Sequence, residues 1–171
     1  MPLGTDYSGQ GCSLARTLEV VGERWTLLIL RDLFFGVSRF SDLQRHLDVP
    51  RAVLSTRIAS LVEGGLVERR PYAPGRDELL LTEAGVDLWP AVHSLMQWGE
   101  KHRSPGGARR VFIHVRCDTA IRATGVCPAC GDEPAAAELE MRPGPGATPP
   151  LRDDAVTLAL REPRRLLTPL R

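Results

Sequence analysis

The chain lacks long hydrophobic runs and has no charge of one dominant sign. Its longest aliphatic run, Leu27–Leu30, has four residues, whereas a membrane-spanning helix needs about 20 apolar residues. Residues 1–11 have neither the basic nor the apolar region of a secretory signal peptide. We therefore expect a cytoplasmic protein that has no membrane partner.

Cysteine and lysine are scarce among the 171 residues. Four cysteines are too few for a secreted disulfide scaffold of this length, and thiols stay reduced in the cytosol. Lysine occurs only as Lys101, so arginine supplies nearly all of the 22 basic side chains, which 21 acidic ones balance to a net charge of +1. This balance excludes a basic tail, although a protein can bind DNA through a basic face alone.

Catalytic motifs are also missing. The sequence contains no G-x-S-x-G elbow, P-loop or dinucleotide-binding fingerprint. Its four histidines show no pairing with a nucleophile or an acid in the sequence. We therefore do not expect an enzyme.

What the sequence does have is helical periodicity in its first hundred residues. The predicted helices are Ser13–Val21, Arg24–Phe35, Arg39–Leu47, Pro50–Glu63 and Glu83–His102. We expect Ser38 to cap the third helix, Asp48 to cap the fourth and Thr82 to cap the last. Two predicted strands, Leu66–Arg70 and Glu78–Leu81, precede the last helix. This order of elements is that of a winged helix-turn-helix.

Composition divides the chain into five segments. We expect an N-terminal arm at 1–11, a winged helix domain at 12–103, a linker at 104–109, a small cysteine-containing module at 110–142, and a proline-rich linker with a C-terminal tail at 143–171. In the tail we expect a short helix at Ala155–Arg161 and a loose segment over the last ten residues. The expected fold is mainly α with a small β-wing, plus a small β-rich, zinc-ribbon-like C-terminal appendage.

The predicted helix Pro50–Glu63 has an unusual exposed face. Leu54, Ile58 and Leu61 face inward, and the opposite face is small, hydroxylated and basic. Such a face can enter the major groove of DNA, where arginine binds guanine and Thr or Ala contacts thymine methyl groups. The candidate DNA-binding residues of this helix, the preceding helix and the hairpin are Arg39, Arg45, Arg51, Ala52, Val53, Ser55, Thr56, Arg57 and Arg76. The alternatives are a helix that faces a protein partner and, for Arg76, a solvent-exposed turn residue.

One histidine and three cysteines follow the predicted linker in an H-x2-C-x9-C-x2-C pattern. Pairs with x2 spacing are typical of zinc knuckles, which supply four tetrahedral ligands. We therefore expect His114, Cys117, Cys127 and Cys130 to bind one structural zinc ion. Zinc would stabilise a module that is too small to hold a core of its own. The alternative is a metal-free turn with ordinary cysteines.

The stretches VVGERWTLLILRDLFFG, RFSDLQRHL, AVLSTRIASLVEGGLVERR and LTEAG, between Cys12 and Gly99, resemble the HxlR family of bacterial transcription regulators, which is close to the MarR type. The resemblance implies a homodimeric winged helix protein that binds inverted-repeat operators in double-stranded DNA. It also implies that the first and last helices of the domain form the dimer interface. Two residues depart from the family pattern, because Val49 precedes Pro50 where a capping Ser or Thr is usual, and Ser13 replaces a proline. The expected function is a sequence-specific repressor, and the alternative is a protein-interaction adaptor that does not bind DNA.

Cys12 directly precedes the first predicted helix, where amide groups and the helix dipole favour a thiolate. The resemblance implies that a cysteine at this place serves some family members as a sensor of oxidants or electrophiles, so Cys12 is the candidate regulatory thiol. The alternative is a small packing residue. A competing effector site is a small apolar ligand held at the dimer interface near Trp89, Met96 and Trp98.

Overall fold

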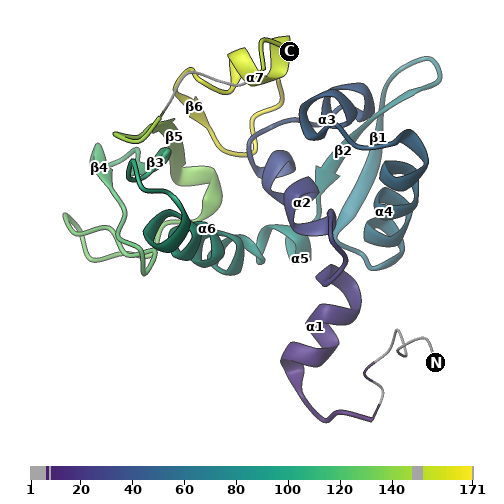
Figure 1. The fold of residues 1–171 in the computed structure, drawn as a ribbon, viewed down its shortest axis with the longest axis horizontal. Coiled ribbons are helices and arrows are strands. Elements are labelled where there is room, and N and C mark those ends of the chain that lie inside the picture. Colours follow the sequence, from purple (N-terminus) through teal and green to yellow (C-terminus); the bar gives the residue numbers. More distant parts are fainter. Residues whose placement is uncertain (1–6, 8, 148–151, 171) are drawn as a thin grey trace.

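The order of elements along the chain is that of a winged helix-turn-helix followed by a second, small sheet (Figure 1). The computed structural model describes residues 7, 9–147 and 152–170. The helices of this part are α1 (Ser13–Val21), α2 (Thr26–Phe34), α3 (Phe40–Leu47), α4 (Arg51–Glu63), α5 (Glu83–Val86), α6 (Trp89–Arg103), the 3-10 helix η1 (Ala136–Glu138) and α7 (Ala155–Ala159). The strands are β1 (Val67–Ala73), β2 (Arg76–Leu81), β3 (Arg110–His114), β4 (Thr119–Ala120), β5 (Leu139–Pro143) and β6 (Arg164–Arg165). No helix within the described ranges has the length and apolar character to cross a bilayer. The predicted fold class, a mainly helical winged helix with a small β-rich C-terminal part, is confirmed.

α2 is the central helix of the winged helix because it carries apolar residues on every side. Ile29, Leu30 and Phe34 have no exposed surface, and they share one core with Leu43 of α3. The inward-facing residues predicted for α4 are all buried, namely Leu54, Ile58 and Leu61. Gly65, with a φ of 71°, lies just after the end of α4, where a left-handed residue commonly ends a helix.

Two of the predicted helix caps are wrong, and α3 and α4 both begin without a capping side chain. Arg39 rather than Ser38 is the N-cap of α3, because Ser38 is buried and its carbonyl accepts a hydrogen bond from the Leu79 amide (2.7 Å). Asp48 ends α3 in the left-handed region (φ 53°), and Pro50 is the N-cap of α4. Strand β2 and the proline therefore fix the positions where these helices begin.

The single long helix predicted over Glu83–His102 is two helices. Thr82 caps α5 as predicted, and its hydroxyl accepts a hydrogen bond from the Gly85 amide (3.2 Å). α5 ends after about one turn, and α6 begins at Trp89 with Pro90 in its first turn. Proline has no amide proton to continue a helical ladder, so this position starts a new helix.

The wing is an antiparallel hairpin of β1 and β2, and it is longer than predicted. The two strands pair along their length, with a bulge between Pro71 and Ala73. Arg70 donates to Glu78 across the hairpin (2.7 Å), which supports pairing toward the tip. Gly75, with a φ of 66°, lies in the turn. The tip extends away from the helices at one end of the molecule (Figure 1).

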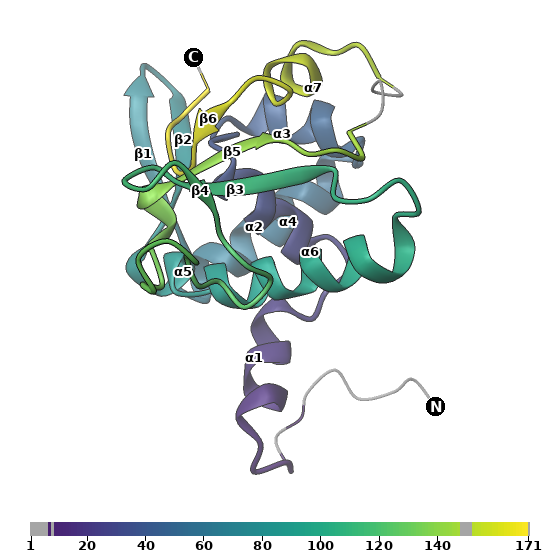
Figure 2. The same cartoon turned by 90° about the vertical axis from the view of Figure 1, so that its left-hand side faces the viewer.

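The C-terminal sheet has the strand order β4-β3-β5-β6, and all neighbouring strands are antiparallel. β3 and β5 run alongside α6 (Figure 2). Phe112 of β3 packs against Trp89 of α6 and against Phe35, with ring centroids 4.9 Å and 6.3 Å apart. The sheet therefore shares an aromatic cluster with the winged helix, while the predicted domain boundaries stay a prediction.

The expectation that the last ten residues are loose is wrong. β6 pairs with β5, and Leu166 is only 2% exposed. The Leu167 amide donates to the Phe34 carbonyl, and the Leu170 amide donates to the Gly36 carbonyl, both at 2.8 Å. The tail thus adds a strand to the C-terminal sheet and then binds the end of α2.

α1 extends away from the other elements (Figures 1 and 2). Ala15 and Val21 are buried, whereas Leu14 and Leu18 are 64% and 38% exposed. A helix of nine residues is marginally stable on its own in water. α1 therefore leaves an apolar face exposed in the single chain.

Candidate DNA-binding surface and metal-binding cluster

The face of α4 that is predicted to contact DNA is exposed and carries short side chains. Ala52, Ser55 and Thr56 are exposed. The Thr56 hydroxyl donates to the Ala52 carbonyl (3.0 Å), and the Ser60 hydroxyl donates to the Thr56 carbonyl (3.1 Å), so both lie along the helix. Val53 is half-buried against the core, so it extends outward less than predicted. A face of this kind can approach another surface closely.

Two arginines border this face through contacts with aromatic rings. The Arg51 guanidinium lies 5.0 Å from the centroid of Phe40, at the start of α3. The Arg39 guanidinium lies 5.1 Å from the centroid of Tyr72 on the wing. Cation–π contacts hold a guanidinium in place without neutralising its charge. The structure therefore keeps two positive charges beside α4, one at its start and one between α3 and the wing.

Two further predicted arginines form ion pairs with acidic side chains. Arg57 pairs with Glu23 (3.2 Å), and Arg45 pairs with Asp42 one turn earlier (3.7 Å). Exposed ion pairs contribute about 0–1 kcal/mol, so a phosphate group can replace either carboxylate at little cost.

The wing carries more positive charge than the sequence analysis identified. Arg76 is exposed at the hairpin tip, as predicted. Arg69 and Arg70 on β1 are also exposed, although Arg70 pairs with Glu78. The adjacent arginine pair in a predicted strand of the hairpin was the signal that could have identified them. The predicted DNA-binding residues thus lie on α4, on α3 and on the wing, which are neighbouring elements in Figure 1.

The four predicted metal ligands form one cluster in the C-terminal sheet. The ligand atoms of His114, Cys117, Cys127 and Cys130 all lie within 4.8 Å of one another. His114 Nδ1 and Cys130 Sγ are 3.5 Å apart. In a tetrahedral zinc site with Zn–S near 2.3 Å and Zn–N near 2.0 Å, neighbouring sulfur and nitrogen atoms lie about 3.5 Å apart. The cluster is therefore compact enough to hold one metal ion.

The loop around Cys127 has the backbone of a metal-binding knuckle. Gly131 adopts a φ of 79°, and its amide donates to the Cys127 carbonyl (2.8 Å). Desolvation acts to raise the pKa of the Cys127 thiol, but hydrogen bonds from the backbone of Cys130 and Ala129 outweigh it and lower that pKa. A thiolate is the form that binds metals, so this loop favours the coordinating state of Cys127.

An exposed ion pair connects the two halves of the cluster. Arg116, which lies beside Cys117, pairs with Asp132 of the Cys127 loop. The hydrogen bond and the charge of Arg116 lower the pKa of the Asp132 carboxyl. Such contacts around the ligands orient them for a metal ion.

The buried Asp32 carboxylate, which sequence analysis did not identify, joins α2 to α3. The Asp32 carboxylate has no exposed surface, and it accepts hydrogen bonds from Arg31 (2.7 Å) and contacts His46 Nδ1 (2.6 Å). A buried carboxylate is tolerated only when it is paired in this way. Asp32 and its two partners therefore fix how the helix-turn-helix sits on the central helix.

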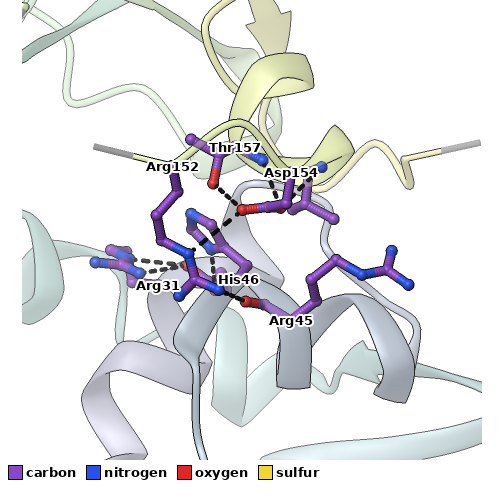
Figure 3. Close-up of polar contacts among 8 residues, drawn as sticks. Arg31, Arg45, His46, Arg152, Asp154 and Thr157 are labelled. Atoms are coloured by element: carbon purple, nitrogen blue, oxygen red, sulfur yellow. Dashed lines mark hydrogen bonds and ion pairs between the residues drawn. The ribbon is translucent and has the colours of Figure 1, made fainter. Parts of the chain in front are cut away.

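The tail extends this polar network onto α3 (Figure 3). Arg152 donates to the Arg45 carbonyl (2.8 Å), although it comes more than a hundred residues later. The Asp154 side chain accepts a hydrogen bond from the Thr157 hydroxyl (2.6 Å) and caps α7 by accepting from the Val156 and Thr157 amides. The start of α7 is thereby fixed against the last turn of α3.

The two predicted effector positions differ in exposure. Cys12 is exposed just before α1, so the alternative of a packing residue does not hold within one chain. Trp89 is buried in the aromatic cluster and cannot line an open interface. Trp98 is 55% exposed and Met96 is half-buried. The predicted apolar ligand site near these three residues is therefore not a single surface.

Comparison with known proteins gives consistent matches. A family model described as HxlR-like helix-turn-helix matches residues 20–106. Rv3095 of Mycobacterium tuberculosis, named an uncharacterised HTH-type transcriptional regulator, is 48% identical over 140 residues, which cover 80% of this chain and 89% of that protein. This alignment necessarily extends beyond residue 106, so the likeness includes part of the C-terminal sheet.

Two solved structures match this chain over different lengths. PA1607, described as a candidate transcription factor, has a TM-score of 0.64 at 27% identity, and the match covers 86% of this chain and 99% of that one. The oxidised form of HypR, described as a redox regulator, has a TM-score of 0.51 at 29% identity and covers 54% of this chain and 98% of that one. The fold of PA1607 therefore extends over most of this chain, whereas that of HypR covers about half.

Proposed function

Because the chain belongs to the HxlR-like helix-turn-helix family, whose members it resembles over more than half its length, we propose that it is a homodimeric, sequence-specific repressor of the bacterial cytoplasm. The observation that carries this proposal is the exposed, small and hydroxylated face of α4, bordered by Arg51 and followed by the basic wing. Solvated helix faces are usually rich in Glu and Lys. The exposed face of α4 instead carries small and hydroxylated side chains, which suit close contact with the major groove.

Each part of this surface has a distinct role in DNA binding. α4 enters the major groove, where Ala52 and Thr56 contact base edges and Arg51 donates to guanine. Arg39 and Arg45 bind phosphates and orient the protein without reading sequence. Arg76 places a positive charge on the backbone or in a narrow minor groove beside the wing.

A second copy of the chain is the proposed partner of α1. Leu14 and Leu18 of α1 are exposed, and so are Leu95 and Trp98 of α6. Apolar groups on two helices form a surface that another protomer can bury. A two-fold dimer would place its two α4 helices in successive major grooves, about one DNA turn apart.

Gel-shift titration of the full chain on the DNA upstream of its own gene tests this function. We expect saturable binding whose affinity falls steeply with salt, because arginines displace counterions from phosphates. Competition with unrelated duplex separates specific from general binding. A dimer without salt-sensitive affinity for any duplex would instead favour the protein-interaction adaptor.

We also propose that His114, Cys117, Cys127 and Cys130 bind one structural zinc ion per chain. The spacing of the ligand atoms and the knuckle at Gly131 fit a tetrahedral site. Bound zinc supplies folding free energy to the C-terminal sheet, since β3 and the cysteine loops are joined at the ligands. His114 and Cys127 are buried, whereas Cys117 is half-buried and Cys130 is exposed, so one side of the site faces solvent.

Elemental analysis of protein purified without chelator tests the zinc site. One zinc per chain is expected, and the double variant Cys127→Ser/Cys130→Ser should contain none. Chelation should speed hydrogen exchange in residues 110–141 while the helices of the winged helix stay protected. Absence of zinc, or zinc retained by the double variant, would exclude this site.

Finally, we propose that Cys12 is a regulatory thiol. It is exposed at the start of α1, the helix that leaves an apolar face exposed, and one structural neighbour, HypR, is described as a redox regulator. Alkylation forms a carbon–sulfur bond there, and the added bulk changes the free energy of the dimer. Operator affinity measured with and without N-ethylmaleimide should change in the wild type and stay constant in Cys12→Ser. Equal responses of the two proteins would assign Cys12 to packing.

A further inference from the structure

A cavity of about 270 Å³ lies where the helix-turn-helix meets the C-terminal sheet. Its walls come from Arg31 and Phe35 at the end of α2, His46 of α3, Met96 of α6 and Arg110 of β3. Arg110 comes after residue 106, where the match to the family model ends. The cavity therefore depends on the C-terminal sheet that is fused to the winged helix in this chain.

Two guanidinium groups approach the same aromatic ring inside this cavity. The guanidinium carbons of Arg31 and Arg110 lie 6.0 Å and 5.3 Å from the centroid of Phe35. Arg31 is paired with the buried Asp32. Arg110, in the described part of the chain, donates to the carbonyl of Leu160 (2.5 Å), which carries no net charge. The second guanidinium therefore contacts a carbonyl dipole and a ring, and the Asp32 carboxylate acts on it without a hydrogen bond among the described residues.

The surroundings of Arg110 disfavour its charge. Burial lowers the pKa of Arg110, and the nearby positive charge of Arg31 lowers it further, whereas Asp32 acts in the opposite direction. Arg109 and Glu100 also line the cavity, and the Glu100 carboxylate accepts a hydrogen bond from Gln97 (3.3 Å). The positive charge of Arg31 acts against that of Arg110, and an anion placed between the two guanidinium groups would offset this effect.

The rest of the wall is apolar and leaves room for a ligand. Phe35 and Met96 supply apolar surface. Gly99 of α6 also lines the cavity, and a Cβ atom built there would have no atom within 4 Å. Small-molecule sites usually have volumes of about 300–1,000 Å³ with a few converging polar groups. The size and lining of this cavity fit a compact molecule with one ring and one charged group.

We propose that this cavity binds a small organic carboxylate, with the carboxylate between Arg31 and Arg110 and the apolar body against Phe35 and Met96. Arg31 already donates to Asp32 through Nε and Nη2, and Arg110 donates to Leu160 through Nη1. The ligand carboxylate would accept from the remaining N–H groups of the two guanidinium ions, because charge-assisted hydrogen bonds of this kind are strong. Such a ligand contacts α2, α3, α6 and β3 together. Its binding would therefore shift the position of the helix-turn-helix relative to α6 and change the affinity for DNA. This effector role rests on the proposed function, whereas binding of the ligand does not.

Calorimetric titration of the full chain with phenylacetate, and with its neutral analogue phenylacetamide, tests the cavity. We expect saturable binding of phenylacetate and at least about tenfold weaker binding of the amide, because only the carboxylate pairs with both arginines. Arg110→Met should weaken the binding of phenylacetate by a similar factor. Thermal unfolding of each variant shows whether it is folded.

Gly99→Leu is the second variant, since it fills the cavity without removing a charge. Leucine meets no atom at its Cβ and has a higher helix propensity than glycine, so the variant should fold and lose phenylacetate binding. Ala91→Leu, at an exposed position of the same helix, is its matched control and should bind normally. No saturable binding of phenylacetate, equal binding of the amide, or unaltered binding by Gly99→Leu would overturn the proposal.

Operator affinity with and without saturating phenylacetate then tests the effector role. The effector role is supported if phenylacetate changes the operator affinity of the wild type but not that of Gly99→Leu. Unchanged affinity in a protein that binds both phenylacetate and DNA overturns the effector role alone. Absence of DNA binding overturns the proposed function and leaves the calorimetric result standing.

Discussion

Single arginines around α4 differ in the contacts that hold them, and this difference predicts different effects on DNA binding. Arg51 lies against Phe40 at the start of α4, where a side chain can reach base edges. Arg76 is exposed at the hairpin tip, where only the DNA backbone or the minor groove is within reach. Arg51 should therefore affect the specificity of DNA binding, and Arg76 should affect the affinity for all DNA sequences.

Replacing Arg51 by alanine should reduce affinity for the operator by about 10- to 100-fold, equivalent to roughly 1–3 kcal/mol, and relax specificity at one base pair. Arg76→Ala should weaken binding to all sequences alike and reduce the salt slope by about 1, because one phosphate contact is lost. Gel-shift titrations at several salt concentrations measure both effects. Arg161→Ala, in the exposed segment after α7, is the control and should change neither. Identical behaviour of the Arg51 and Arg76 variants would contradict this division.

Gly36 is the residue on which the tail depends most directly. It has a φ of 84°, and a Cβ atom there would lie 1.9 Å from the Thr168 carbonyl oxygen. Gly65 also has a positive φ, of 71°, but its added Cβ would meet no atom within 4 Å. The two glycines therefore separate backbone strain from collision with the tail.

Gly65→Ala should cost about 1–2 kcal/mol of unfolding free energy, which is the strain of a left-handed alanine. Gly36→Ala should cost more, because it also displaces residues 166–170 from α2. Urea denaturation measures the two losses, and limited proteolysis should cleave the tail in the Gly36 variant first. Equal losses with an intact tail would mean that the tail contact contributes nothing to stability.

The burial of individual residues could be predicted where it follows helical periodicity. Roles that depend on contacts with distant parts of the chain could not. Leu54, Ile58 and Leu61 are buried as their spacing indicates. The Ser38 cap failed because a strand forty residues later binds the Ser38 carbonyl. No sequence pattern predicts that Asp32 of α2 pairs with His46 of α3. Aspartate and histidine are both common on exposed helix faces, so neither residue indicates a buried partner.

At the scale of elements, α1 is a short helix that leaves part of its apolar surface exposed. It contributes Ala15 and Val21 to the protomer, and it leaves Leu14 exposed. Its position far from the wing means that a change on its apolar face affects association rather than the DNA-reading surface (Figure 1).

Leu14→Glu should weaken dimerisation by about tenfold or more, because the dimer would have to bury an unpaired carboxylate. Light scattering at increasing protein concentration measures the shift toward monomer. Thr17→Glu is the matched control, since Thr17 is exposed on α1 and already polar. A Leu14 variant that stays dimeric at the lowest concentration would place the interface elsewhere.

The types of the winged helix elements could be predicted from the sequence, but the break between α5 and α6 and the docking of the tail with its strand β6 could not. The break between α5 and α6 had a signal in Pro90, which the apolar stripe of the surrounding residues outweighed. The docking of the tail had none, because Leu166 and Leu167 are apolar residues without periodic neighbours. Their role depends on the end of α2, more than a hundred residues away.

At the scale of the whole molecule, α2, α6 and the C-terminal sheet share one aromatic cluster. His93 of α6 is 2% exposed and packs between Trp89 and Phe112, with ring centroids 5.6 Å and 5.5 Å away. Burial lowers the pKa of His93 below its ordinary value of 6.5. The winged helix and the C-terminal sheet are therefore joined around a histidine that the native state keeps neutral.

This histidine makes stability depend on pH. As pH falls through about 6.5, the unfolded state binds a proton at His93 that the native state does not, so the free energy of unfolding decreases. Denaturation midpoints at pH 7.5 and 5.5 should differ, and His93→Phe should reduce this difference while keeping an aromatic ring. His102→Gln, at an exposed position of α6, should leave the difference unchanged. An unaltered difference in His93→Phe would assign the pH dependence to another group.

The contact of the tail with the end of α2 also has a consequence for the order in which the protein is made. A ribosome delivers the chain from its N-terminus, and domains generally fold as they emerge. The carbonyls of Phe34 and Gly36 receive hydrogen bonds from Leu167 and Leu170, which the ribosome adds more than 130 residues later. The winged helix therefore leaves the ribosome before this part of its surface is covered. Its final structure is completed only after residues 167–170 have emerged.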